Sequence, residues 1–218
     1  SLGMIIGLAA IALVVLSWLV AHYLSWRHPR ALQHALKTVT YPMQLLTLNR
    51  LAPQPHYTKA DISPHFWPNG KIPTSERWKQ LAAEGFRDYH LEIGGLVENP
   101  VELSLADIAK LCDAEQITMH HCIQGWSGIA QWSGVPMQAI IDLVRPKPEA
   151  GTVAFFSFGE ALYGGDYYDT QSIENVCKPQ CLLATHMNGE PLSDVYGAPL
   201  RLRVENQLGY KMVKWIKR

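Results

Sequence analysis

The first 26 residues, from Ser1 to Trp26, contain no Asp, Glu, Lys or Arg. An apolar run of about 20 residues is long enough to cross a bilayer as an α-helix. A core helix would carry a polar stripe, which is absent here, and a secretory signal would combine a positive start with a short apolar stretch. Trp18, Tyr23 and Trp26 lie toward one end, as interfacial aromatic residues do. The run predicts a retained transmembrane helix over residues 1–26, with a core helix and a signal peptide as the alternatives.

Basic residues follow this run at Arg27, Arg30 and Lys37. Positive charge next to a span favours the cytoplasmic side, so this chain alone slightly favours a cytoplasmic soluble part. The periplasmic side is the alternative, since charges ahead of Ser1 would change the balance. Residues 27–53 are expected to form a juxtamembrane segment, with a surface helix over 31–51, and a linker.

Composition limits what the remaining residues, 54–218, can do. The 19 basic and 19 acidic residues cancel, so nothing indicates a nucleic-acid-binding face. Apolar residues make up 48% of the chain and include seven tryptophans, which is enough for a packed core. Four cysteines in a chain of 218 residues do not indicate a disulfide scaffold. We expect one soluble domain over residues 54–218.

Strand-like and helix-like patterns interleave within this domain. Alternating polarity predicts strands over 88–97 and 117–123, a buried strand over 152–158, and a further alternation over 200–205. A helix is predicted to begin at Ser104, with Asp107 completing its cap, and a second one spans 137–144. There is no regular βαβ repeat, so the expected fold class is α+β.

The stretch "MHHCIQGWSGIAQW" places Cys122 at a predicted strand end, before a Gly-Trp turn. Four interpretations are open for this thiol: a packed side chain, a zinc ligand, a nucleophile, or a ligand to a softer metal. His120 and His121 should point to opposite faces of the strand, which disfavours one shared zinc ion. Cysteine-protease partners would have to come from elsewhere in the fold, so that signal is weak.

The other cysteines are less informative. Cys112 has no motif around it and is expected in the core. Cys177 and Cys181 are four residues apart, a spacing that zinc allows, but no second paired element completes a tetrahedral site. The sequence leaves open whether these two pair with each other or stay as thiols.

The sequence around Cys122, "IQGWSG" followed by "WSGVP", resembles the molybdenum domain of the sulfite oxidase family, and especially its bacterial methionine-sulfoxide reductase members. The resemblance continues in the segments "ISPHFWPNGKIP" and "LEIGGLVENPVELSLADI". It is most specific in "LLATHMNGEPLSDVYGAPLRLRVENQLGYKMVKWIKR", so it runs from about Ile62 to the C-terminus. It implies a sulfite-oxidase-type molybdopterin-binding domain of mixed sheets and short helices.

By this resemblance, Cys122 is the sole protein ligand to the molybdenum of a molybdenum–molybdopterin cofactor, and it is the catalytic residue. A soft thiolate suits a metal that already has sulfur ligands. The resemblance also implies further cofactor-binding residues, on the phosphate side and in the N-terminal segment: His65, Trp67, Ser157, Arg201, Lys211, Met212, Val213 and Lys214. The basic residues among them would bind a phosphate as a fork or as point charges; the alternative is a solvated basic tail. His121 stands where relatives often carry arginine, and it either acts on the cofactor or simply packs.

The expected reaction is a two-electron oxygen-atom transfer, with a sulfoxide or N-oxide reduced. No arginine occurs between His121 and Trp132 to bind the sulfite dianion. Trp126, Trp132 and the tyrosines of "LYGGDYYDT" suit a neutral substrate. A membrane haem protein or quinone-linked partner at a bacterial inner membrane would supply electrons. The competing function is a silent or zinc-stabilised membrane-tethered binding module of the same fold.

Overall fold

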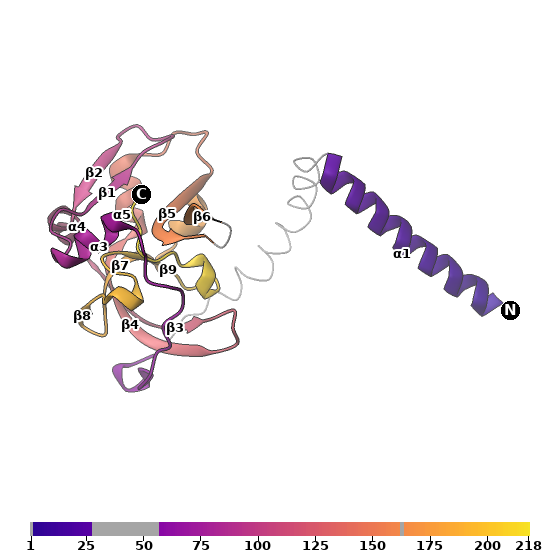
Figure 1. The fold of residues 1–218 in the computed structure, drawn as a ribbon, viewed down its shortest axis with the longest axis horizontal. Helices are drawn as coiled ribbons and strands as arrows, with labels where there is room; N and C mark the ends of the chain where they lie inside the picture. The colour runs from indigo at the N-terminus through magenta and orange to yellow at the C-terminus, as the bar shows by residue number, and fades with distance from the viewer. Residues whose placement is uncertain (1, 28–56, 162–163) are drawn as a thin grey trace. The chain divides into compact units, whose positions relative to one another are not determined.

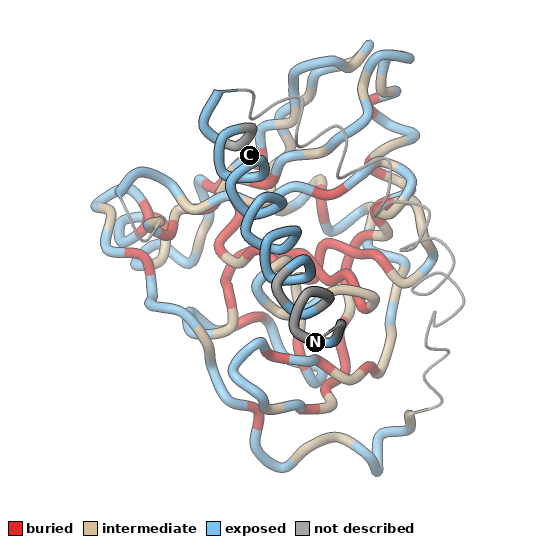
Figure 2. Tube along the Cα trace, turned by 90° about the vertical axis from the view of Figure 1, so that its right-hand side faces the viewer, coloured by how far each residue is buried: buried red, intermediate tan, exposed pale blue. Residues whose placement is uncertain are grey.

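The computed structural model describes residues 2–27, 57–161 and 164–218. Helix α1 (Leu2–Arg27) belongs to one compact unit, residues 1–52, and everything from residue 53 onward forms the other. Residues 9–23 of α1 are exposed throughout, as the pale blue trace in Figure 2 shows. Among the described residues, no helix was found to have the length and apolar character of a membrane span. The helix is therefore confirmed, whereas its insertion into a membrane stays a prediction. The predicted juxtamembrane segment, with Arg30 and Lys37, lies outside the described residues.

A mixed arrangement of antiparallel strands and short helices makes up the second unit (Figure 1). Its largest sheet has the order β3-β4-β7-β8, and β9 also pairs with β7. These strands are β3 (Ala114–His121), β4 (Ser127–Pro136), β7 (Cys181–Met187), β8 (Glu190–Pro191) and β9 (Arg201–Val204). Two hairpins stand apart from it: β1 (His90–Ile93) with β2 (Val101–Ser104), and β5 (Thr152–Glu160) with β6 (Asp166–Ser172). The α+β expectation is confirmed.

The helices and 3₁₀ turns of this unit are short. They are η1 (Lys59–Asp61), α3 (Glu76–Ala83), α4 (Leu105–Lys110), α5 (Met137–Val144), α6 (Ile173–Val176), η2 (Asp194–Tyr196) and η3 (Gly209–Lys211). The predicted helix over 137–144 has the bounds of α5. The predicted strand over 152–158 lies in β5, but its burial alternates, with Phe155 and Ser157 buried and their neighbours partly open. That strand is therefore half-buried, because its sheet has only two strands and one covered face.

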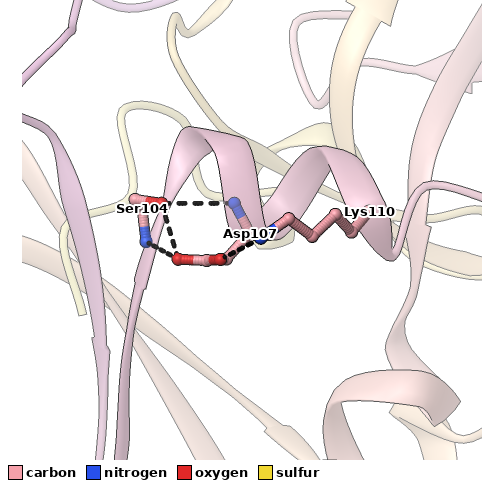
Figure 3. A network of polar contacts seen from close by, with 3 residues as sticks. All are labelled: Ser104, Asp107 and Lys110. Carbon is pink, nitrogen blue, oxygen red and sulfur yellow. Dashed lines mark hydrogen bonds and ion pairs between the residues drawn. The ribbon is translucent and has the colours of Figure 1, made fainter.

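Helix α4 begins as its sequence predicts (Figure 3). The Ser104 hydroxyl accepts a hydrogen bond from the Asp107 backbone N–H at 3.2 Å and donates to its carboxylate at 2.6 Å. That carboxylate also pairs with Lys110 at 2.8 Å. Lys110, and then Ser104, lower the pKa of Asp107 to about 2. Such a reciprocal cap fixes the start of a helix that is too short to persist by propensity alone.

The central sheet separates two hydrophobic clusters. Leu182 and Ala184 of β7 pack in one cluster with Trp132 and Phe66, whereas Leu183 packs in the other. Alternate residues of a strand face opposite sides, so each face of the sheet has its own core. The expectation for Cys112 is wrong: it follows α4 and is exposed, because the helix turns its other face to the core through Ile108.

The C-terminal segment is tied to several elements. The Phe156 N–H donates to the Arg218 carbonyl at 2.8 Å, and Phe158 N–H donates to the Trp215 carbonyl at 2.8 Å. The Tyr89 hydroxyl, fully buried, donates to the Ile216 carbonyl at 2.7 Å. These bonds hold the last residues along β5. Their ladder pairing with β5 is limited to one isolated bridge, between Ser157 and Ile216.

Gly134 is expected to tolerate no side chain. It lies at the register shift between β4 and β7, and a Cβ added there would sit 2.0 Å from the Leu183 carbonyl oxygen. Gly134→Ala should lower the free energy of unfolding by more than about 3 kcal/mol, because the obstacle is backbone and cannot move aside. Denaturant unfolding would measure this loss. Gly151→Ala, which meets nothing within 4 Å, is the control; equal stability of the two variants would contradict the expectation.

Candidate cofactor site

A tight turn after β3 holds Cys122 in place. The Cys122 N–H donates to the Trp126 carbonyl at 2.9 Å, and the Gly125 N–H donates to the Cys122 carbonyl at 3.1 Å. Gly125 has φ of +88°, a conformation that favours glycine. The predicted Gly-Trp turn is therefore present, and it fixes the thiol at the end of β3.

Hydrogen-bond donors surround the Cys122 sulfur, whose residue is 6% exposed. The Asn69 side-chain amide lies 3.3 Å from Sγ and the Gln124 backbone N–H lies 3.5 Å from it. Sγ also lies 3.8 Å from the Gln124 side-chain oxygen, so polar groups on more than one side hold the sulfur in place. Asn69 was not singled out in the sequence, because nothing local to "PNG" links it to a thiol 53 positions later.

A cavity of about 560 Å³ is connected to this thiol through Asn69, which lines the cavity while its side-chain amide contacts the sulfur. Cys122 itself is not one of the lining residues. The wall combines parts of the segment 66–74, His120 of β3, Trp126 just before β4, the end of β5 and the C-terminal segment. Five of the predicted cofactor-binding residues line it: Trp67, Ser157, Arg201, Met212 and Lys214.

The remaining three predicted residues lie elsewhere. His65 lines a neighbouring hollow and contacts the Trp67 ring edge-on at 4.5 Å between centroids. Lys211 pairs with Asp169 at 2.6 Å, and Val213 is buried in the hydrophobic core. The alternation of an extended segment explains Val213, since its neighbours Met212 and Lys214 face the cavity and it faces the opposite side.

Two cations, the buried Arg201 and the partly buried Lys214, dominate the electrostatics of the cavity. Arg201 is 4% exposed; its Nη1 donates to the Tyr196 carbonyl at 3.0 Å, and its Nε has no hydrogen-bond partner. Lys214 donates to the carbonyls of Asn69 and Val195. Within the described residues, neither cation forms an ion pair. Buried charge without a counter-charge is costly, so this wall is suited to an anion.

Burial, with a smaller effect of Arg201, lowers the pKa of Lys214 to about 7. Burial likewise lowers the pKa of Arg201, with Arg203 adding to the effect. A lysine normally titrates near 10.4, so between about pH 7 and about pH 10 the unfolded chain binds a proton that the folded chain has lost. Lys214 by itself should therefore make the metal-free protein more stable as pH rises from about 7, whereas the raised pKa values of Cys181 and Cys177 act in the opposite direction above about pH 9.

Thermal unfolding of the metal-free protein across this pH window would test the effect. Lys214→Met should flatten the rise, whereas Lys147→Met, at an exposed position, should preserve it. An equal slope in the Lys214→Met variant would contradict the assignment.

A buried polar network lies behind the cavity wall. Arg203, fully buried, pairs with Glu205 at 2.7 Å, and its Nη1 lies 2.9 Å from His120 Nδ1. The guanidinium of Arg203 also stacks over the ring of Trp132, 4.2 Å from the ring centroid. The sequence showed the alternation of Arg201, Arg203 and Glu205, but alternation alone does not say whether the polar face meets water or a buried site.

The two histidines before Cys122 lie on opposite faces of β3, as their adjacent positions in the strand predict. His120 is 3% exposed and lines the cavity, whereas His121 is exposed and contacts the Ser127 hydroxyl at 2.9 Å through Nδ1. Burial, together with Arg203 and Arg201, lowers the pKa of His120 to about 2. His120 is thus a neutral ring in the wall of the site.

Within the part of the chain that the structure describes, no three His, Cys, Asp or Glu side chains group as a metal-binding set. Cys177 and Cys181 are both free thiols. Burial raises the pKa of Cys181 to about 12 and also raises that of Cys177.

The chemical groups in and next to the cavity are of the kinds that bind a molybdopterin. A buried thiol with donors around it suits a soft metal, and two unpaired cations suit a phosphate. The orphaned Nε of Arg201 is the most direct sign that an acceptor belongs there.

Comparisons with known proteins agree with this fit. The putative protein-methionine-sulfoxide reductase subunit YedZ1 of Azospira oryzae is 34% identical over 139 residues, 64% of this chain and 50% of that protein. The protein-methionine-sulfoxide reductase catalytic subunit MsrP of Campylobacter jejuni is 30% identical over 156 residues, 66% of this chain and 52% of that protein. The chain spans about half the length of these curated relatives.

Among solved structures, the sulfane dehydrogenase SoxCD from Paracoccus pantotrophus matches with a TM-score of 0.53 and 25% identity. The match covers 61% of this chain and 37% of that one. The family model described as the oxidoreductase molybdopterin binding domain matches residues 78–218, so the segment 62–73 lies ahead of its first matched residue. The resemblance found in the sequence is confirmed: the chain belongs to the family of oxidoreductases with a molybdopterin-binding domain.

Proposed function

We propose that this protein is a molybdenum-dependent oxidoreductase whose metal is held by Cys122. The observation that carries the proposal is the buried thiol that Asn69 connects to a cavity whose wall includes Arg201 and Lys214, two cations that form no ion pair among the described residues. In this proposal Arg201 and Lys214 bind the phosphate of molybdopterin, and Trp67, Ser157 and Met212 contact the rest of it. When bound, the cofactor supplies two-electron oxygen-atom transfer.

The protein's own groups have three tasks in this proposal. Asn69 and the Gln124 N–H donate hydrogen bonds to the Cys122 sulfur and orient it. Arg201 and Lys214 neutralise a phosphate, and Lys214 can take up a proton as the anion binds because its pKa lies near 7. Aromatic side chains limit water: Phe66, Trp67, Trp126, Tyr167, Tyr196, Tyr210 and Trp215 all contribute to the wall.

The proposed reaction is reduction of a sulfoxide or N-oxide to the corresponding sulfide or amine. The relatives in the comparison are called methionine-sulfoxide reductase subunits, which favours the sulfoxide. Of the three tyrosines expected near the substrate, Tyr167 lines the cavity, Tyr168 is 58% exposed outside its lining, and Tyr163 lies outside the described residues. With Arg201 and Lys214 assigned to the cofactor phosphate, the rest of the wall is largely aromatic and suits a neutral acceptor better than the sulfite dianion.

The proposal includes membrane attachment through residues 1–26 at a bacterial inner membrane. It rests on the absence of charged side chains from residues 1–26 and on the exposed apolar side chains of α1, among them Leu13, Val14 and Trp18. Electrons would come from a membrane haem protein or another quinone-linked partner. Arg27, Arg30 and Lys37 favour the cytoplasmic side.

Location can be tested at Cys112, an exposed thiol of the soluble domain. A membrane-impermeant maleimide added to intact spheroplasts should leave Cys112 unlabelled if the domain is cytoplasmic. Labelling before lysis would place the domain in the periplasm, and recovery in the soluble fraction would refute the anchor. Cys112→Ser protein controls for labelling of other cysteines.

Elemental analysis of protein made in a host that synthesises molybdopterin tests the function. About one molybdenum per chain, with a released pterin, and reduction of methionine sulfoxide by the reduced enzyme are the expected results. Zinc in place of molybdenum would favour the binding-module alternative. Sulfite turnover without sulfoxide reduction would refute the proposed reaction.

A further inference from the structure

His120 presents a ring edge to the cofactor cavity. Its ring lies against Trp126 and Phe66, with centroids 5.4 Å and 5.5 Å away, so it is held on two sides. A Cβ added to Gly209 would lie 2.4 Å from its Nε2, which shows that Nε2 faces the bare backbone of Gly209. Both residues line the cavity.

The two ring nitrogens of His120 have different surroundings. Nδ1 lies 2.9 Å from Nη1 of Arg203, and a guanidinium has protons to donate but no lone pair to accept with. Nδ1 must therefore be the acceptor. In a neutral ring the proton then resides on Nε2.

Nε2 has no hydrogen-bond partner among the described residues, yet it is not one of the fully buried polar atoms that lack a partner. The ring that carries this atom lines the cavity. The ring of His120 is held firmly because its partner Arg203 is itself fixed, by the Glu205 carboxylate at 2.7 Å and by the ring of Trp132.

His120 also shares a face with the thiol. It is two residues before Cys122, and alternate residues at the end of β3 are buried in step: Thr118, His120 and Cys122. Residues two apart on a strand are spaced by about 6.6 Å. His120 and Cys122 thus lie on the same side of the chain, with His120 in the cavity wall.

We infer that Arg203 and Glu205 position His120 in its Nε2–H tautomer, so that it donates a hydrogen bond to an oxygen acceptor at the metal end of the cavity. This inference rests on the proposed function and deepens it. Arg203 and Glu205 act only through His120 and are positioning residues. The acceptor is an oxygen of the cofactor or of the substrate, and the experiment distinguishes these two.

The tautomer can be read directly by long-range ¹H–¹⁵N correlation spectroscopy of ¹⁵N-histidine-labelled protein. His120→Gln assigns the His120 signals by their disappearance, and His186→Gln, outside this cavity, is the matched control. The expected result is an Nε2–H pattern with and without molybdenum; an Nδ1–H pattern would overturn the inference. Because metal-free protein is sufficient, failure to bind molybdenum would refute the proposed function without affecting this result.

The acceptor is then identified in loaded protein. A shift of the Nε2 proton on cofactor loading assigns the acceptor to the cofactor, and a shift on adding methionine sulfoxide assigns it to the substrate. No shift in either step would overturn the inference.

Kinetics provide an independent readout. His120→Leu should lower kcat/KM about tenfold at unchanged molybdenum content, whereas His120→Gln, whose amide can donate from a similar position, should retain most of the activity. Equal rates in the two variants would also overturn the inference.

Discussion

Cys122→Ser protein is expected to fold normally and to lose sulfoxide reduction by more than about a hundredfold, because even groups that only support a metal ligand contribute about 10- to 100-fold. Serine keeps the shape of the side chain, and the turn around residue 122 depends on backbone hydrogen bonds that the change leaves intact. The absorption from the molybdenum–thiolate bond should vanish. Rate measurements together with the visible spectrum of the loaded protein would check this.

Cys112→Ser is the matched control, since Cys112 is an exposed thiol away from this cavity. It should retain both the spectrum and the rate. A Cys122→Ser protein that kept its spectrum and activity would show that another atom holds the metal. A variant that failed to fold would instead point to packing, and circular dichroism would reveal it.

Arg201→Met is expected to separate cofactor retention from stability. Hydrogen bonds to charged groups contribute about 1.5–3 kcal/mol, so losing the phosphate contact should weaken pterin retention by about 10- to 100-fold. Metal-free protein should be no less stable than wild type, because methionine replaces a buried cation that has neither an ion pair nor a partner for its Nε among the described residues. Pterin content after gel filtration and thermal unfolding of metal-free protein are the two measurements.

Arg87→Met, at an exposed position outside the cavity wall, should change neither quantity. A large loss of stability in metal-free Arg201→Met protein would mean that Arg201 supports the fold through Tyr196 and Trp132, without a need for an anion. Unchanged pterin retention would remove Arg201 from the proposed phosphate site.

Local patterns in the sequence predicted the elements whose signals are local. Ser104 and Asp107 identified the start of α4, and the periodicity over 137–144 identified α5. The turn at Cys122 was also predictable, because glycine is favoured in the backbone conformation of Gly125. In each case a few adjacent residues determine the structure.

Features that depend on distant contacts were missed or misplaced. Nothing near Cys112 shows that α4 faces the core with its opposite side, and nothing near Asn69 shows that its amide meets a thiol. The network of Arg203, Glu205 and His120 joins β9 to β3, two strands that do not pair with each other. Such contacts follow from the tertiary fold and have no local signature.

Chain order has a consequence for how the proposed enzyme matures. Met212, Lys214 and Trp215 complete the cavity wall, and the segment that contains them is tied along β5 by backbone hydrogen bonds. Since synthesis proceeds from the N-terminus, these residues emerge from the ribosome after every other part of the wall. A pterin that arrived earlier would meet Cys122 and Arg201 without Lys214, at a site still open to water. Cofactor insertion is therefore expected to follow synthesis of residues 212–215, when the other parts of the wall have already been made.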